Sequence, residues 1–487
     1  MAVNGTSTAQ FDSTSTIPFW RDGQQQTSPL TFDVLSPLDN EFLYKASAAD
    51  QEYVEAAIES ARQAFPLWSS TRPAARRAIF LRAAELFRQR QSELKGYSFR
   101  ETGQASDFHN FEYGATVDIC ESIAGLIQPA SESASPVIND GSALLVKEPY
   151  GVVLAISPWN APYVLGLRAV LTPLAMGNTV IFKGPEAAPA TSWAIADVLH
   201  KAGLPAGCLN TIYHRPSDAS IITSTLIAHP AIRKINFTGS TRVGGILGSL
   251  AGRYLKPVVL ELGGKASAII CDDANIENAA LQCAVGAFLH AGQICMSTER
   301  IIVNAKVVDS FRAAFKTATS KIYSEQGQGT SGQLFSSFSV QNNKKLIDDA
   351  ISKGGSALYG DPTHVETSST KMRPVALEFV DSSMDIYYKE SFGPTVSVIV
   401  VDSDDEAVAV ANDTEYGLSS AVFTEDLRRG LHIARQIQSG AVHINAMTVH
   451  DESMLPHGGF KNSGFGRFNG LDGLREWVQT KVITWKN

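Results

Sequence analysis

The chain has few cysteines, no excess of basic residues and no long hydrophobic run. Five cysteines are spread widely over 487 residues, and their odd number favours reduced thiols over a disulfide framework. The formal net charge of −8 and the lack of any Lys/Arg run leave no basic field for nucleic acid. The polar amino terminus lacks the apolar core of a signal peptide, and no apolar stretch approaches membrane-spanning length. These features predict a cytoplasmic protein without nucleic-acid or membrane partners.

Length and composition indicate an enzyme-like globular protein with more than one lobe. A chain of 487 residues is too long for one ordinary hydrophobic core. Its 44% hydrophobic and 18% charged residues are typical of a soluble protein. Residues 1 to about 15 are rich in Ser and Thr, and we expect them to be frayed.

From Gly151 onward, short apolar runs alternate with helical patterns. The run Val152–Ile156 has the continuous apolar character of a buried parallel strand. The alternation starts again after Cys295, which predicts two α/β lobes with parallel sheets and helices on both faces. The expected strands are 152–156, 179–182, 209–213, 234–237, 258–262, 268–271, 300–303, 396–401, 420–423 and 441–445. The expected helices are 161–176, 191–202, 307–322, 405–411 and 427–437, with amphipathic helices between 49 and 90 and at 111–127. A Ser/Pro/Gly-rich stretch at 131–142 and a strand from Ala143 predict a projecting hairpin.

Cys295 lies in the segment Ala291-Gly292-Gln293-Ile294-Cys295, after a long apolar stretch. A glycine three residues earlier permits a tight turn and a close backbone approach, so the thiol could be presented to a substrate. Most free cysteines are buried as small hydrophobes. The cysteine alone therefore does not define a catalytic site.

Three segments follow predicted strands, where open α/β sheets place their ligands. The segment Phe237–Gly244 enters a helix, so its backbone N–H groups and the helix end could meet a phosphate. Pro158-Trp159-Asn160 follows one strand and Lys183-Gly184-Pro185-Glu186 follows the next. The Glu186 carboxylate could accept ribose hydroxyls. Taken singly, each segment could be an ordinary turn, a helix cap or a solvated charge.

Seven motifs occur in a fixed order along the chain. They are Pro-Trp-Asn (158–160), Lys-x-x-Glu (183–186), Phe-Thr-Gly-Ser (237–240), Glu-Leu-Gly-Gly-Lys (261–265), Gly-Gln-x-Cys (292–295), Glu-Ser-Phe-Gly-Pro (390–394) and Gly-Gly-Phe-Lys-Asn-Ser-Gly (458–464). With these motifs the sequence resembles the aldehyde dehydrogenase superfamily from about residue 30 to the carboxyl end. Within it, the segment Gly292–Arg300 looks like that of the aromatic dehydrogenases for salicylaldehyde, benzaldehyde or vanillin. The resemblance implies oxidation of an aromatic aldehyde to its acid with NAD, or alternatively NADP, as the cofactor and without a metal.

The resemblance also implies the roles of individual residues. Cys295, as thiolate, would attack the aldehyde carbon, and the Asn160 amide and Cys295 backbone N–H would hold the oxyanion. Glu261 would activate the water that hydrolyses the thioester. The implied cofactor contacts are Ile156, Trp159, Lys183, Glu186, Gly239, Ser240, Gly244, Glu390 and Phe392. The implied substrate contacts are Arg168, Tyr163, Leu289 and His457.

The sequence departs from the superfamily pattern at several positions. Gly184-Pro185 stands where Pro-x is common, and a frequent lysine nine residues after the asparagine is Ala169. Phe468 stands where some members carry a glutamate proposed as a second base. His457 replaces an aromatic residue, and it could be wall packing or a hydrogen-bonded polar residue.

Arg168 is the most informative substrate residue in the sequence. It lies eight residues after Asn160, on one helix face with Val164 and Leu165. Similar semialdehyde dehydrogenases pair such an arginine with a second one, but that second position is Leu289 here. One guanidinium in an apolar tunnel suits an aromatic ring with a polar substituent. The alternative is an internal ion pair, because buried arginines are usually paired.

The resemblance implies three structural parts and a homodimer or homotetramer. We expect a Rossmann-like cofactor domain at 1–130 and 150–261, a catalytic α/β domain at 262–449, and an oligomerisation element at 131–149 and 466–487. The alternatives are a semialdehyde or aliphatic aldehyde dehydrogenase, a hydrolytic thiol enzyme, and a catalytically silent structural or binding protein on this fold.

Overall fold

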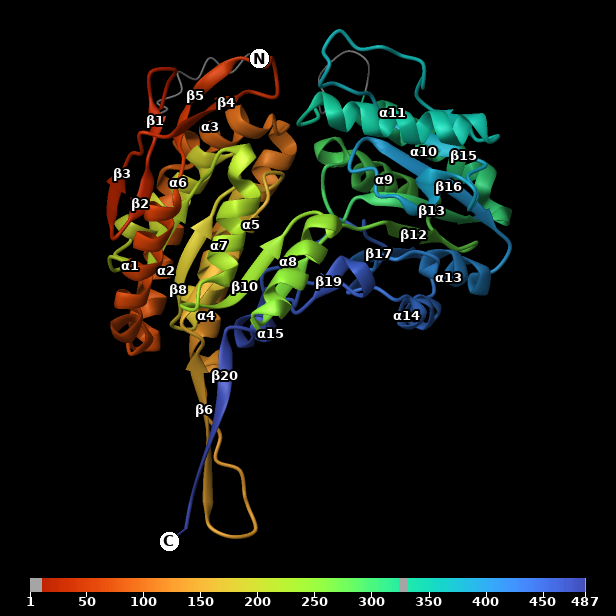
Figure 1. The fold of residues 1–487 in the computed structure, drawn as a ribbon. Helices are drawn as coiled ribbons and strands as arrows, with labels where there is room; N and C mark the ends of the chain where they lie inside the picture. Colours follow the sequence, from red (N-terminus) through yellow and green to blue (C-terminus); the bar gives the residue numbers. More distant parts are fainter. Residues whose placement is uncertain (1–10, 324–331, 487) are drawn as a thin grey trace.

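Two α/β lobes lie side by side, and a long two-stranded ribbon projects from the first of them (Figure 1). The computed structural model describes residues 11–323 and 332–486. The ribbon pairs β6 (Ser142–Pro149) antiparallel with β20 (Val478–Trp485) along their full length. The strand predicted from Ala143 is β6, but it pairs with β20, and the segment before it contributes only the isolated bridge between Ala134 and Leu145. Most of the frayed terminus expected at residues 1 to about 15 lies outside the described residues.

A six-stranded sheet forms the centre of the first lobe, in the order β19-β11-β10-β7-β8-β9. All neighbours are parallel except β19, which pairs antiparallel with β11. Every residue of β7 and β8 is buried, which explains their continuous apolar runs. The strands are β7 (Val152–Ile156), β8 (Thr179–Lys183), β9 (Leu209–Ile212), β10 (Ile232–Thr238), β11 (Val258–Glu261) and β19 (Gly464–Phe465).

Helices cover both faces of this sheet, as the alternating pattern predicts (Figure 1). They are α1 (Gln51–Ser69), α2 (Pro73–Gln89), α3 (Gln91–Thr102), α4 (Ser106–Ala130), α5 (Pro162–Ala175), α6 (Pro189–Lys201), α7 (Ala219–Ala228), α8 (Thr241–Arg253) and α15 (Gly470–Arg475), with a short 3-10 turn η1 (Pro216–Asp218). Helix α5 is buried on nearly every side, so it carries no polar stripe.

Short strands near the amino terminus and helix α3 have no clear signal in the sequence. They are β1 (Thr16–Ile17), β2 (Phe19–Arg21), β3 (Gln24–Gln26), β4 (Thr31–Leu35) and β5 (Phe42–Ser47). The three residues of β3 are all glutamine, so the strand shows no alternation of polar and apolar residues. Its pairing with β2 places it in a sheet.

The second lobe contains a seven-stranded sheet in the order β14-β15-β16-β13-β12-β17-β18. The strands are β12 (Ala266–Ile270), β13 (Thr298–Asn304), β14 (Ser356–Tyr359), β15 (Val375–Glu378), β16 (Thr395–Val401), β17 (Ser419–Phe423) and β18 (Ala441–Ile444). The helices and 3-10 turns are α9 (Ile276–Phe288), η2 (Leu289–Gly292), η3 (Ala305–Val307), α10 (Val308–Ile322), α11 (Ser337–Ser352), α12 (Asp385–Tyr388), α13 (Asp404–Asn412), α14 (Leu427–Gln436) and η4 (Lys461–Ser463). The sequence does not predict α11, β14 and β15. No helix among residues 11–323 and 332–486 is long and apolar enough to cross a membrane.

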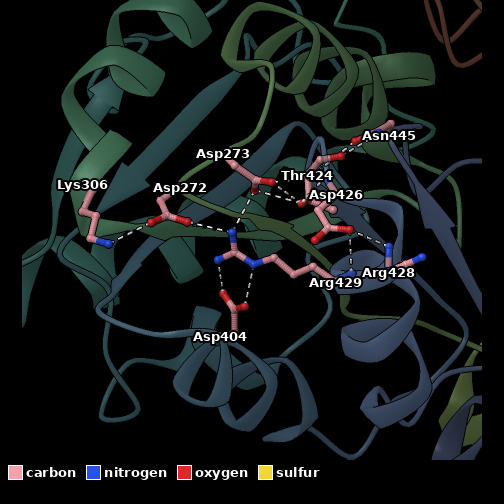
Figure 2. A network of polar contacts seen from close by, with 9 residues as sticks. All are labelled: Asp272, Asp273, Lys306, Asp404, Thr424, Asp426, Arg428, Arg429 and Asn445. Carbon is pink, nitrogen blue, oxygen red and sulfur yellow. Dashed lines mark hydrogen bonds and ion pairs between the residues drawn. The ribbon is translucent and has the colours of Figure 1, made fainter.

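One arginine ties three segments of the second lobe together (Figure 2). Arg429, in the first turn of α14, donates two hydrogen bonds to Asp404 of α13 at 2.6 and 2.7 Å. Its Nη1 reaches Asp272 at 2.8 Å and Asp273 at 2.9 Å, just after β12. Thr424, just after β17, donates to Asp273 at 2.8 Å. The guanidinium therefore fixes both helices to the ends of neighbouring strands.

We expect Arg429→Met to lower the stability of the second lobe by about 1–3 kcal/mol. The change leaves Asp272, Asp273 and Asp404 without their shared counter-charge. Thermal unfolding followed by circular dichroism measures the effect. Arg428→Met is the matched control, because Arg428 is exposed on the same turn. Equal melting temperatures for the two variants would show that the network contributes nothing to stability.

Candidate active site

Cys295 follows a turn with a left-handed backbone at three consecutive residues. His290, Ala291 and Gly292 have φ of 51°, 53° and 73°, so the chain reverses sharply after α9. A Cβ on Gly292 would lie 2.0 Å from the Gly393 carbonyl oxygen, which explains why only glycine fits there. The His290 ring stacks on Phe108 with a centroid distance of 4.4 Å and holds the strained turn in place.

Polar contacts join the motif at 261–265, the segment at 292–300 and the motif at 390–394 around this turn. Lys265 Nζ lies 2.7 Å from Glu299 Oε2. The other Glu299 oxygen accepts hydrogen bonds from the Ser391 N–H at 2.9 Å and hydroxyl at 2.8 Å. The Gly264 N–H donates to Glu390 at 2.8 Å. Glu299 thus positions the segment that contains Glu390 beside the cysteine turn.

The Cys295 side chain stands where two cavities meet, since Cys295, Asn160 and Leu165 line both. The apolar cavity, of about 430 Å³, extends to one side. The sheet-edge cavity, of about 300 Å³, extends to the other side along the carboxyl ends of the first sheet. The apolar walls of the first cavity are Phe108, Phe111, Ala115, Ile119, Ala161, Val164, Leu165, Ile294, Met296, Val449 and Met454. A thiol at such a junction can react with a molecule from each side.

Asn160 is buried at this junction and held by two hydrogen bonds. Its Nδ2 donates to the Gln293 carbonyl at 3.0 Å, and its backbone carbonyl accepts from Gln104 at 3.1 Å. An amide nitrogen has two N–H groups, so one remains for an oxygen on a carbon attached to Cys295. This arrangement agrees with the expected oxyanion contact.

Glu261, at the end of β11, is buried from solvent, and its carboxylate is hydrogen-bonded to Arg168. Its Oε2 accepts a 2.6 Å hydrogen bond from Arg168 Nη2, and Arg168 Nη1 lies 3.3 Å from Asp451 Oδ2. The guanidinium carbon also lies 4.5 Å from the centre of the Phe468 ring. The other oxygen, Glu261 Oε1, is buried without a hydrogen-bond partner. Of the two readings of Arg168, the structure shows the internal ion pair, so its guanidinium is not free for a substrate substituent.

The surroundings of Glu261 and Cys295 shift the pKa values of these two side chains in opposite directions. Burial raises the pKa of Glu261, but the His457 imidazole and the Arg168 guanidinium outweigh it and lower the pKa to about 2. Burial, with the Glu261 carboxylate beside it, raises the pKa of the Cys295 thiol well above its usual range. The resting pair is therefore an ionised carboxylate next to a protonated thiol. The expected thiolate has to form during the reaction.

Most residues expected to bind a cofactor gather at the carboxyl edge of the first sheet. Trp159, Gly239, Ser240, Glu390 and Phe392 line the sheet-edge cavity. Ile156 and Lys183 end β7 and β8, and Lys183 Nζ lies 3.8 Å from Glu186. Gly244 lines neither cavity, but a Cβ there would lie 2.4 Å from Leu262, so it lets α8 pack closely on the sheet.

The four expected substrate residues have different surroundings. Arg168 and His457 line the apolar cavity. Leu289 lies behind it, packed against the cluster that contains Phe108 and Ile294. Tyr163 lines neither cavity, because its hydroxyl donates to the Leu94 carbonyl at 2.6 Å in the core of the first lobe. The expected contact of Tyr163 with substrate is therefore not supported.

Several residues at the site have no signal in the sequence. Phe338, Ser339 and Asn342 of α11 line the sheet-edge cavity, but they come from a helix that the pattern does not reveal. Asp451 lines the apolar cavity from the loop after β18. Ile294 and Met296 also line the apolar cavity. These two residues do have a signal in the sequence, because they lie on either side of Cys295.

Comparison with known proteins identifies the family. The model for the "Aldehyde dehydrogenase family" matches residues 20–483. A vanillin dehydrogenase from Pseudomonas sp. (strain HR199) is 42% identical over 94% of this chain and 95% of its own. A salicylaldehyde dehydrogenase from Pseudomonas putida is 36% identical over 96% of each chain. The crystal structure of a salicylaldehyde dehydrogenase from Pseudomonas putida G7 complexed with salicylaldehyde superposes with a TM-score of 0.93 at 35% identity, covering 97% of this chain and 98% of that one.

The chain therefore belongs to the aldehyde dehydrogenase family. Its two-lobed α/β fold is the one that its relatives adopt. The protein is an oxidoreductase that acts on the aldehyde group with NAD(P).

The opposite pKa shifts of Glu261 and Cys295 predict how fast the thiol reacts when no cofactor is bound. Glu261→Gln removes the carboxylate that raises the Cys295 pKa and leaves the Arg168 charge, which lowers it. We expect iodoacetamide to alkylate Cys295 up to about tenfold faster at pH 8 in this variant. Intact-protein mass spectrometry measures the rate, and Glu277→Gln, an exposed carboxylate of α9, is the control. Slower alkylation in Glu261→Gln would mean that the carboxylate activates the resting thiol.

Proposed function

We propose that this protein oxidises an aromatic aldehyde to the carboxylic acid through a thioester on Cys295, with NAD as the preferred cofactor. The observation that carries the proposal is the position of Cys295 between an apolar cavity and the carboxyl edge of the first sheet. An aldehyde on one side and a cofactor on the other then meet at a single sulfur.

The apolar cavity fits an aromatic ring. Phe108, Leu165, Ile294 and Val449 supply flat and branched apolar surface next to Cys295, and burying a ring against such walls is favourable. The relatives named vanillin, salicylaldehyde and benzaldehyde dehydrogenase support the same substrate class. At the rim, the hydroxyls of Ser122 and Ser453 lie 2.6 Å apart, where they could meet a ring substituent.

The charges of the apolar cavity disfavour a carboxylated semialdehyde. Arg168 is the only Lys or Arg among its lining residues, all of which lie in the described part of the chain, and it is already paired with Glu261 and Asp451. Asp118, Glu121 and Glu452 add negative charge. A substrate carboxylate would therefore meet no free cation and would lose its hydration.

In the acylation half of the reaction, the Cys295 thiol releases its proton to water, and the resulting thiolate bonds to the aldehyde carbon. The carbonyl oxygen becomes an alkoxide, which the free Asn160 N–H and the Cys295 backbone N–H stabilise. The apolar walls exclude water from the adduct. When bound, the nicotinamide ring supplies the hydride acceptor that converts this adduct to a thioester.

In the deacylation half, Glu261 removes a proton from water and the resulting hydroxyl attacks the thioester carbon. The carbon–sulfur bond then breaks and Cys295 leaves as a thiolate. Because Arg168 occupies Glu261 Oε2, the base is Oε1, which has no hydrogen-bond partner. Arg168 thus serves the reaction by orienting Glu261.

The sheet-edge cavity fits a nicotinamide dinucleotide. Gly239 and Ser240 stand at the amino end of α8, where N–H groups can face a pyrophosphate. A Cβ on Gly239 would lie 2.5 Å from the Phe237 ring, so the turn tolerates no side chain. Burial raises the pKa of Glu390 to about 8, so its carboxyl is suited to hydrogen-bond a ribose hydroxyl. Trp159 and Phe392 flank the end nearest Cys295.

Glu186 is the reason to expect NAD in preference to NADP. Burial raises its pKa, but the Lys183 ammonium 3.8 Å away, the Glu186 backbone N–H and His214 together outweigh burial and lower the pKa below its usual value. An ionised carboxylate accepts both hydroxyls of the adenosine ribose and repels a 2′-phosphate.

The six-stranded sheet, the seven-stranded sheet and the β6–β20 ribbon support a division into functional parts. We propose a cofactor domain at 1–130 and 150–261, a catalytic domain at 262–449 and an oligomerisation element at 131–149 and 466–487. The ribbon of β6 and β20 exposes Val482, Ile483 and Trp485, and a two-stranded ribbon is marginal on its own. We infer that it adds to another subunit in a homodimer or homotetramer. The five free thiols support a reducing compartment, the cytoplasm.

A kinetic panel tests the function and the cofactor together. We expect kcat/KM for vanillin, salicylaldehyde or benzaldehyde to exceed that for succinic semialdehyde by about a hundredfold, and NAD to exceed NADP by about tenfold. Cys295→Ala should abolish oxidation of every aldehyde and keep NAD affinity. Preference for succinic semialdehyde would replace the aromatic proposal, and efficiency with NADP equal to that with NAD would remove the role of Glu186. Normal turnover in Cys295→Ala would exclude the mechanism.

A further inference from the structure

His457 lies between the catalytic carboxylate and a second, more exposed carboxylate. Its Nε2 is 3.8 Å from Glu261 Oε1, and its Nδ1 is 3.8 Å from Asp451 Oδ1. The Asp451 side chain is 17% exposed, whereas that of Glu261 is 1% exposed. The imidazole therefore connects a buried base to a group that reaches water.

The backbone fixes the position of this imidazole. An isolated bridge pairs His457 with Phe468 through N–H···O bonds of 2.8 and 2.7 Å. Asp451 is held separately, by the Asn469 amide at 2.7 Å and by Arg168 at 3.3 Å. Closing either 3.8 Å gap to a hydrogen bond requires a movement of only about 1 Å, which a rotation of the His457 side chain supplies.

The contacts of Glu261 show which of its two oxygens is available to exchange a proton with His457. Oε2 is bonded to Arg168 and Oε1 has no partner, so a proton taken from water arrives on Oε1. The other titratable or charged groups near this pair are Arg168 and Cys295 beside Glu261, His443 beside His457, and Arg467 beside Gly458. The two guanidinium groups carry only N–H donors and have no atom that accepts a proton. Phe468, beneath Arg168, has no group that can accept one.

We propose that His457 carries the deacylation proton from Glu261 to Asp451 and out through the mouth of the apolar cavity. Water gives a proton to Glu261 Oε1 as its oxygen bonds to the thioester carbon. The Oε1–H proton passes to His457 Nε2, which restores the Glu261 carboxylate and creates an imidazolium. The imidazolium then releases its Nδ1 proton to Asp451 or to water beside it, so the histidine is neutral again. This inference rests on the proposed thioester mechanism.

The lifetime of the acyl-enzyme tests the relay directly. The enzyme is mixed with NAD and benzaldehyde, quenched at intervals and analysed by intact-protein mass spectrometry for the benzoyl adduct. In His457→Ala we expect the adduct to form at the wild-type rate within about twofold and to persist about tenfold longer or more, the scale of lost proton transfer. Added imidazole should enter the vacated space and shorten the lifetime with saturable dependence.

Controls separate proton transfer from structure. His450→Gln removes a nearby imidazole that pairs with Glu452 and does not contact Glu261, so we expect the wild-type lifetime. His457→Asn fills the site without a proton carrier and should match His457→Ala in lifetime. An unchanged lifetime in both His457 variants, or a long lifetime that imidazole does not shorten, would overturn the relay. If no adduct accumulates even in Glu261→Gln, in which deacylation should be slow, the thioester mechanism itself fails, and the relay with it.

Discussion

The buried contact between Arg168 and Glu261 is the constraint on which the chemistry of this protein depends. A carboxylate at the end of β11 is almost completely buried, and without a partner it would be neutral. The His457 imidazole and the guanidinium, 2.6 Å away, together keep it ionised, and the guanidinium occupies one oxygen. It also compensates part of the negative charge that holds the Cys295 proton in place. One arginine on α5 therefore orients the base and, together with His457, keeps it ionised beside the sulfur.

The two lobes supply different parts of this arrangement. Parallel strands of the first sheet end together at Ile156, Lys183 and Glu261, so residues far apart in sequence meet at one edge. The second lobe adds the cysteine turn, whose shape depends on left-handed residues and on a glycine that touches Gly393. The loop after β18 adds Asp451 and His457. The site exists only where these three pieces come together.

Much of this could be predicted from the sequence, because its signals are local. Continuous apolar runs identified β7 and β8, and the ordered motifs identified the residues at the strand ends. The sequence leaves the two interpretations of Arg168 open, because its partners, Glu261 and Asp451, lie 93 and 283 residues away and helix periodicity carries no information about them. Tyr163 follows the motif closely, but its hydroxyl bonds to Leu94 in the core. The sequence of helix α11 has no clear periodic pattern, so it does not reveal that Phe338, Ser339 and Asn342 line the sheet-edge cavity.

The most direct test of the account is the time course of NADH formation by Glu261→Gln with an aromatic aldehyde. If Glu261 is the base of deacylation, NADH should appear in a rapid burst of about one equivalent per active site. Steady turnover should then be slower than wild type by about a hundredfold or more. Steady turnover at the wild-type rate would remove Glu261 from deacylation. Loss of the burst itself would show that Glu261 is already needed to form the thioester, and would contradict its assignment to deacylation alone.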